Sequence, residues 1–257
     1  KWTFFNFNFD FKTAYSFYGG LIGGVFLTIS SHGTDQLIVQ RVLSTKNLID
    51  AKKALIASGF VVAFQMLLFL VIGFLLFVFY EQSGMDFSAK KNEILPYYVV
   101  TYLPVGVAGI VIASIYAAAI STLSSSINAM ASSSLFDFKF KENSLFWSRL
   151  LTVVWGLALC FSAILFMGQQ GNKNVLEIGL SVASILYGGV LAVFIAARLS
   201  WRLPSWRFTL VLFSGVISVA LLWYKQLMSG ETLIAWTWFI PIGFSISIIL
   251  AVIFKKK

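Results

Sequence analysis

The feature that most limits what this chain can fold into is the run 54–80, which contains no charged residue. As an α-helix this run would be about 40 Å long, enough to cross a hydrocarbon core of about 30 Å with some tilt. In lipid only helices and closed barrels satisfy the backbone, and a barrel strand would alternate apolar and polar residues. The run does not alternate, so it predicts a membrane-spanning α-helix.

Six further segments have the same apolar character, and the composition agrees with them. Charged residues make up only 11% of the chain and hydrophobic residues 59%, whereas soluble domains carry about 25% charged residues. The sequence therefore predicts an all-α membrane protein, a single transmembrane domain over residues 1–257 with about seven spans. The expected spans are 15–31, 54–80, 104–134, 146–167, 175–197, 208–224 and 233–254.

Positive charge is concentrated at alternate ends of these spans. Thirteen of the 19 Lys and Arg residues lie after the first, third, fifth and seventh spans or beside those ends. Because cytoplasmic loops are enriched in Lys and Arg, we expect the N-terminus of this chain outside and its C-terminus in the cytoplasm. The membrane would be a plasma membrane or a bacterial inner membrane. The net charge of +9 then follows from insertion and anionic lipid, without a nucleic-acid partner.

Two segments outside the spans are informative. The opening, 2–11, is polar and aromatic and too short to span, and we interpret it as an outside loop that follows another helix. The chain is therefore expected to be the C-terminal portion of a longer protein. Between the first two spans, the amphipathic pattern within 33–53 predicts a short helix along the membrane surface. Asp35, in this segment, is interpreted as solvated or paired with Arg41.

The first span carries two overlapping pairs of glycines four residues apart, Gly19 with Gly23 and Gly20 with Gly24. Small residues at this spacing allow helices in lipid to approach closely, and close packing is the favoured interpretation. The alternative is that the glycines loosen a helix that bends beside a bound solute.

The third span has an unusual content of hydroxyl groups. Eight of the fourteen residues 121–134 are Ser or Thr. Ala118, Ser121 and Thr122 stand at i, i+3 and i+4, on one face of a helix. Hard cations prefer oxygen ligands, so this face can contribute hydroxyls and a carbonyl to a weak cation site, with a second, broken helix supplying the remaining oxygens. Alternatively, the hydroxyls bond their own i−4 carbonyls or a neighbouring helix.

Three blocks together resemble the sodium/solute symporter family. They are residues 33–43, beginning Gly-Thr-Asp-Gln, then 103–106 with 117–131, and 187–194. The resemblance implies the inverted-repeat fold of the leucine transporter, with this chain as the second five-helix repeat plus two trailing helices. The first repeat, absent here, would be a partner. The family's sodium ligands fall on Ala118, Ser121 and Thr122.

The resemblance places solute contacts on Thr28, Ser31 and Glu177. Sugar-carrying members have a Lys at the position of Val62, so that sugar contact is absent, and the pattern is closer to carriers of iodide, monocarboxylates and vitamins. Glu177 has an alternative interpretation as a charge near a helix end that reaches the membrane interface beside Lys173.

The expected function is sodium-coupled secondary active symport of a small polar solute by alternating access. Sodium would be the coupling ion, the lipid bilayer and the solute would be the other partners, and no enzymatic activity is expected. A transporter-like membrane sensor module and an ion channel remain as alternatives.

Overall fold

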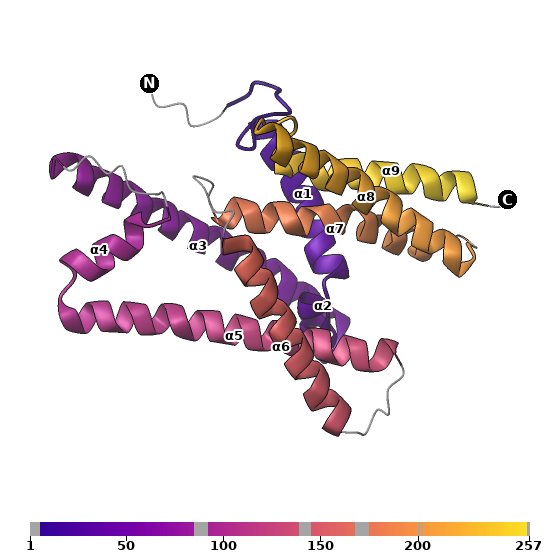
Figure 1. Cartoon of the computed structure of the whole chain (residues 1–257), viewed down its shortest axis with the longest axis horizontal. Coiled ribbons are helices and arrows are strands. Elements are labelled where there is room, and N and C mark those ends of the chain that lie inside the picture. The colour runs from indigo at the N-terminus through magenta and orange to yellow at the C-terminus, as the bar shows by residue number, and fades with distance from the viewer. Residues whose placement is uncertain are drawn as a thin grey trace. The chain divides into compact units, whose positions relative to one another are not determined.

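The computed structural model describes residues 6–84, 92–138, 145–167, 175–199, 201 and 203–255. These residues form helices and connecting segments, without a strand among them (Figure 1). The helices are α1 (Phe17–Thr34), α2 (Gln36–Leu43), α3 (Leu48–Gln82), α4 (Ile94–Tyr102), α5 (Val105–Asp137), α6 (Leu145–Met167), α7 (Val175–Arg198), α8 (Ser205–Ser229), the 3-10 turn η1 (Trp236–Trp238) and α9 (Phe239–Phe254).

Six helices in the described part of the chain are long and apolar enough to cross a membrane: α3, α5, α6, α7, α8 and the continuous segment of η1 and α9. The prediction of an all-α membrane protein is confirmed. The first expected span is present as α1, an 18-residue helix. It is not among the six, and it carries five glycines and ends in the polar sequence Ser-Ser-His-Gly-Thr.

Two short helices complete the set. The expected short helix of the 33–53 segment is α2, and Asp35 lies at its start, where its Oδ1 accepts a hydrogen bond from the N–H of Leu37 (2.9 Å). The helix α4 was not predicted, because its segment had been interpreted as part of an outside connection. Aromatic packing holds it in place: Tyr98 and Tyr102 contact the ring of Phe79 on α3, with centroids 5.2 and 4.9 Å away.

The chain forms two compact units, residues 1–39 with 175–257, and residues 40–174. In the first unit α7, α8 and α9 lie side by side (Figure 1). Small residues allow this approach: a Cβ at Gly188 would lie 2.8 Å from the backbone of α9, and Gly189 and Gly215 are equally close to their neighbours. Without side chains at these positions, the helix backbones pack directly against one another. The single transmembrane domain expected over the whole chain stays a prediction.

The N-terminal aromatic segment belongs to this first unit. The N–H of Ala235 donates to the carbonyl of Phe11 (2.7 Å), and the rings of Phe9 and Phe11 pack against Trp238 at 5.8 and 4.9 Å. Ser16 then begins α1, with its hydroxyl accepting from the N–H of Gly19 (3.1 Å), a usual N-cap arrangement. The opening segment therefore covers η1 before the chain enters α1.

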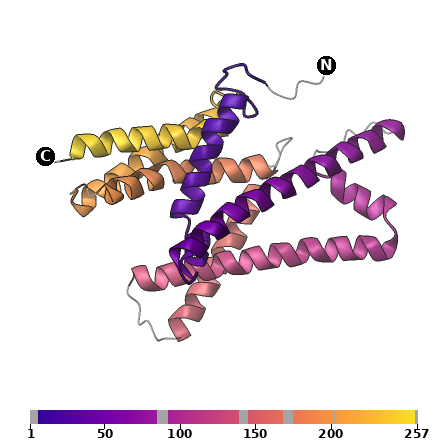
Figure 2. The same cartoon turned by 180° about the vertical axis from the view of Figure 1, so that it is seen from behind.

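In the second unit α3 and α5 are long helices joined through α4, as Figure 2 shows. Helix α6 packs against α5, and Trp155 Nε1 donates to Ser134 Oγ (2.9 Å). Most side chains in the charge-free part of α3, residues 54–80, are apolar and exposed, among them Phe60 and Leu70. A helix that is apolar all round requires lipid or further protein around it.

Candidate functional site

The hydroxyl-rich face expected for a cation lies on α5, in the second unit. Ala118, Ser121 and Thr122 are all exposed on this helix. The Thr122 hydroxyl donates to the Ala118 carbonyl (3.0 Å), and the Ser125 hydroxyl donates to the Ser121 carbonyl (2.9 Å). These are the i−4 bonds that the sequence had left open as the alternative to ligation.

The i−4 bonds also determine which atoms this face of α5 can offer to a cation. A hydroxyl has one proton and two lone pairs. Because Thr122 and Ser125 direct their protons inward to helix carbonyls, the lone pairs of their oxygens face away from the helix. A carbonyl oxygen that accepts one hydrogen bond keeps a second lone pair, so Ala118 O can still approach a cation. Thr122, Ser125 and the Ala118 carbonyl therefore present acceptor lone pairs on this face, as a weakly bound monovalent cation requires.

A guanidinium group lies beside this face. Arg41, in the last turn of α2, donates from Nη2 to Ser125 Oγ (3.1 Å). Both residues belong to the second compact unit. Ser125 stands one helical turn beyond Ser121 on the same stripe of α5. No local pattern predicted this contact, which joins residues 84 positions apart.

Asp35 has partners other than the expected Arg41, in the first unit. Its Oδ2 accepts a hydrogen bond from the hydroxyl of Tyr187 on α7 (2.7 Å), while Oδ1 caps α2. The pairing of Asp35 with Arg41 was therefore wrong. Their spacing of six residues does not place two side chains on one helix face. The carboxylate instead joins the end of α1, the start of α2 and the middle of α7.

The two glycine pairs of α1 have different surroundings. A Cβ at Gly23 would lie 2.9 Å from the Cβ of Thr237 and closer still to that residue's carbonyl oxygen, whereas at Gly24 nothing lies within 4 Å. A Cβ at Gly19 would likewise meet close neighbours, the nearest at 2.9 Å, whereas a Cβ at Gly20 would meet nothing within 4 Å. Helix α1 is continuous through all four glycines. Close packing therefore accounts for Gly19 and Gly23, and the other pair faces open space.

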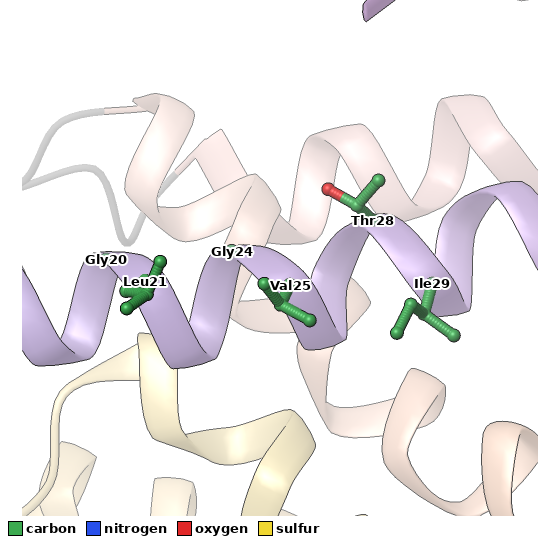
Figure 3. Close-up of a pocket in the computed structure, with 6 residues that line it drawn as sticks. All are labelled: Gly20, Leu21, Gly24, Val25, Thr28 and Ile29. Atoms are coloured by element: carbon green, nitrogen blue, oxygen red, sulfur yellow. The ribbon is translucent and has the colours of Figure 1, made fainter. Parts of the chain in front are cut away.

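Gly20 and Gly24 form the floor of a groove along α1 (Figure 3). Its volume is about 390 Å³, and the residues that line it lie on successive turns of this one helix. Thr28 supplies the hydroxyl in an otherwise apolar lining. The lining residues are Gly20, Leu21, Gly24, Val25, Thr28 and Ile29.

The three residues predicted to contact solute are not brought together. Thr28 lines the groove, but Ser31 does not, and its hydroxyl donates to the Thr28 carbonyl (3.3 Å) and lies 3.1 Å from His32 Nδ1. Glu177 accepts a hydrogen bond from the hydroxyl of Tyr15 (2.5 Å), which holds the start of α7 to the segment before α1. Lys173, its expected companion at the interface, lies outside the described residues.

Comparison with known proteins identifies the family to which the chain belongs. The profile of the sodium:solute symporter family matches residues 5–203. The chain belongs to this family. The match includes α1 to α7 and all three sequence blocks on which the resemblance rests, so that part of the prediction is confirmed.

Curated relatives include several sodium-coupled carriers. The chain is 36% identical to the sodium/sialic acid symporter NanT of Aliivibrio fischeri over 162 residues, which cover 59% of this chain and 32% of the relative. It is 30% identical to human sodium-coupled monocarboxylate transporter 1, over 74% of this chain and 33% of the relative. It is also 30% identical to the human sodium/iodide cotransporter, over 74% of this chain and 31% of the relative. The chain thus spans about a third of the length of these relatives.

Proposed function

We propose that this chain is the C-terminal part of a carrier that uses the sodium gradient to drive uptake of a small solute. Its first five expected spans would form the second inverted repeat of a leucine-transporter-like fold, followed by two trailing helices. A first repeat from the same carrier would complete the assembly. In this arrangement the N-terminus of the chain lies outside and the C-terminus in the cytoplasm, following the distribution of Lys and Arg.

The observation that carries the proposal is the set of acceptor oxygens that Ala118 and Thr122 present on α5. Ala118, Ser121 and Thr122 contribute a carbonyl and hydroxyls to the coupling ion, and the Thr122 proton is already directed to the Ala118 carbonyl. These ligands are neutral and too few to enclose an ion. The remaining oxygens come from the first repeat, since carriers of this kind build ion sites between two repeats. Entry of one sodium ion at a membrane potential of 100 mV supplies about 2.3 kcal/mol, besides its concentration gradient.

The solute is a small anion that occupies the groove of α1. Sialic acid and monocarboxylates carry a carboxylate and iodide is itself an anion, and these are the solutes named for the relatives described above. The groove supplies an apolar surface with the Thr28 hydroxyl, which suits the uncharged body of such a solute. The positive charge of co-transported sodium compensates the charge of the anion during the crossing.

Uptake by the complete carrier tests this function. Labelled sialic acid, lactate and iodide are offered to proteoliposomes with an inward sodium gradient, and to others with choline in place of sodium. We expect one of these anions to accumulate only with sodium, and Ser121→Ala with Thr122→Ala to raise the sodium concentration needed at least about tenfold. Sodium-independent accumulation, or an unchanged sodium requirement in the double variant, would reject the assignment. This chain reconstituted alone is expected to transport nothing.

A further inference from the structure

The contact between Arg41 and Ser125 places a full positive charge beside the proposed cation site of α5, on the stripe of the helix that carries Ser121 and Ser125. We infer that Arg41 lowers the affinity of the α5 site for sodium and thereby promotes release of the ion on the side of the membrane where α2 lies. This inference rests on the proposed function, because it assumes that the ion binds at Ser121 and Thr122.

Position along the stripe supports the inference. Ser121 and Ser125 are separated by one turn of α5, about 6 Å along the helix axis. The Ser125 hydroxyl uses its proton for the Ser121 carbonyl (2.9 Å) and accepts from Arg41 Nη2 (3.1 Å). The guanidinium is thereby held on an oxygen of the same face that presents acceptor atoms to sodium.

The chemistry of the guanidinium group of Arg41 also supports the inference. A guanidinium cannot lose its proton in a protein, so its charge is present at every physiological pH. It is a donor only, so it competes with a cation for acceptor oxygens and cannot coordinate one. Arg41 is the residue of α2 that carries a positive charge. An ion at Ser121 therefore meets one fixed repelling charge along this stripe.

The size of the effect follows from Coulomb's law. With the axial rise from Ser121 to Ser125, about 6 Å, taken as the separation of the two charges, the binding constant changes about 3-fold in water and about 100-fold at an effective dielectric constant of 20. Arg41 is exposed and Ser125 is half-buried, so the expected effect lies toward the lower end of this range. Removing the charge should strengthen sodium binding at least about threefold.

Sodium binding to the purified complete carrier is measured as the rise in its Tm with sodium concentration, at constant ionic strength kept with choline. We expect Arg41→Gln to reduce the half-saturating sodium concentration at least threefold, and Arg41→Lys, which keeps the charge, to stay within about twofold of the parent. Lys46→Gln removes one charge from the same connection, at another exposed position, and should leave the sodium response unchanged. If Arg41→Gln does not fold, Arg41→Met is the second uncharged variant, with the same expected result.

The sign of the change separates a charge effect from a structural one. A merely structural role for Arg41 predicts weaker sodium binding or a lower sodium-free Tm in Arg41→Gln, and an unchanged or increased half-saturating concentration overturns the inference. The effect of Arg41→Gln should also shrink when Ser125 is Ala, and equal effects in both backgrounds count against the contact. If Ser121→Ala with Thr122→Ala leaves the parental sodium response intact, the proposed site itself fails, which is a distinct result.

Discussion

The substitution Gly23→Ala tests how closely α1 packs against η1, and Gly24→Ala is its matched control. The two positions are adjacent on one helix, and Ala gains up to about 1 kcal/mol over Gly in a helix at either of them. At Gly24 the new methyl group meets nothing within 4 Å. At Gly23 it would lie 2.9 Å from the Cβ of Thr237 and still closer to the Thr237 carbonyl oxygen.

The cost at Gly23 can be estimated from that distance. Carbon atoms pack at about 3.5–4.0 Å, so α1 and η1 must separate by about 0.6 Å or more. A gap of this size forfeits about a quarter to a half of the dispersion attraction along the contact, and overpacking typically costs about 1–3 kcal/mol. Since the helix-propensity gain is common to both variants, Gly23→Ala should be about 1–3 kcal/mol less stable than Gly24→Ala.

Thermal unfolding of the chain in detergent, followed by far-ultraviolet circular dichroism, measures this difference. At about 2–4 °C per kcal/mol, Gly23→Ala should melt about 2–12 °C below Gly24→Ala. Gly19→Ala should also melt below Gly24→Ala, because the Ser16 hydroxyl that caps α1 would lie 2.9 Å from the new methyl group. Equal melting temperatures for Gly23→Ala and Gly24→Ala would refute the close approach of α1 to η1.

Two further predictions concern the first unit. Tyr187→Phe removes the hydrogen bond to Asp35 (2.7 Å) and should lower stability by about 1–3 kcal/mol, since the acceptor is a carboxylate. In a double-mutant cycle of Tyr187→Phe with Asp35→Asn in thermal unfolding, additive losses would show that the bond contributes nothing. Gly24→Leu places a side chain in the groove lined by Thr28, and should abolish solute uptake by the complete carrier while leaving its Tm within about 2 °C. Normal uptake in this variant would remove the groove from the solute path.

Hydropathy located the spans but did not give their ends. The second expected span was 54–80, and α3 runs from Leu48 to Gln82. Its first two turns hold Asp50, Lys52 and Lys53, which lie outside the apolar core of the span. The helix begins at its cap, where Asn47 Oδ1 accepts from the N–H of Asp50 (2.8 Å). A membrane-spanning helix continues into the interface as long as capping and propensity allow, so charge-free length underestimates it.

Patterns within a single helix were easier to predict than contacts between helices. The shared face of Ala118, Ser121 and Thr122 follows from helical spacing alone. The bond between Asp35 and Tyr187 joins residues 152 positions apart, and no local pattern reports such a pair. A local signal was available for the other bond of Asp35, since an Asp just before an amphipathic run is a usual helix cap, but it was not used. The interpretation of Asp35 as solvated or paired with Arg41 missed both the capping bond and the bond to Tyr187.

If sodium binds on α5 as proposed, the back-bonded hydroxyls explain how one surface serves both a stable helix and a reversible ion site. A buried hydroxyl left without a partner costs about 1–3 kcal/mol. Here the proton of Thr122 is already bonded to the Ala118 carbonyl (3.0 Å) whether or not a cation is present. Loss of the ion therefore leaves no donor unpaired on Thr122, and the empty state carries little penalty from this residue. A carboxylate at the same place would hold sodium more tightly and would be costly to expose to lipid when the ion departs. Neutral, internally bonded oxygens are thus the ligands expected of a site that must fill and empty in every cycle.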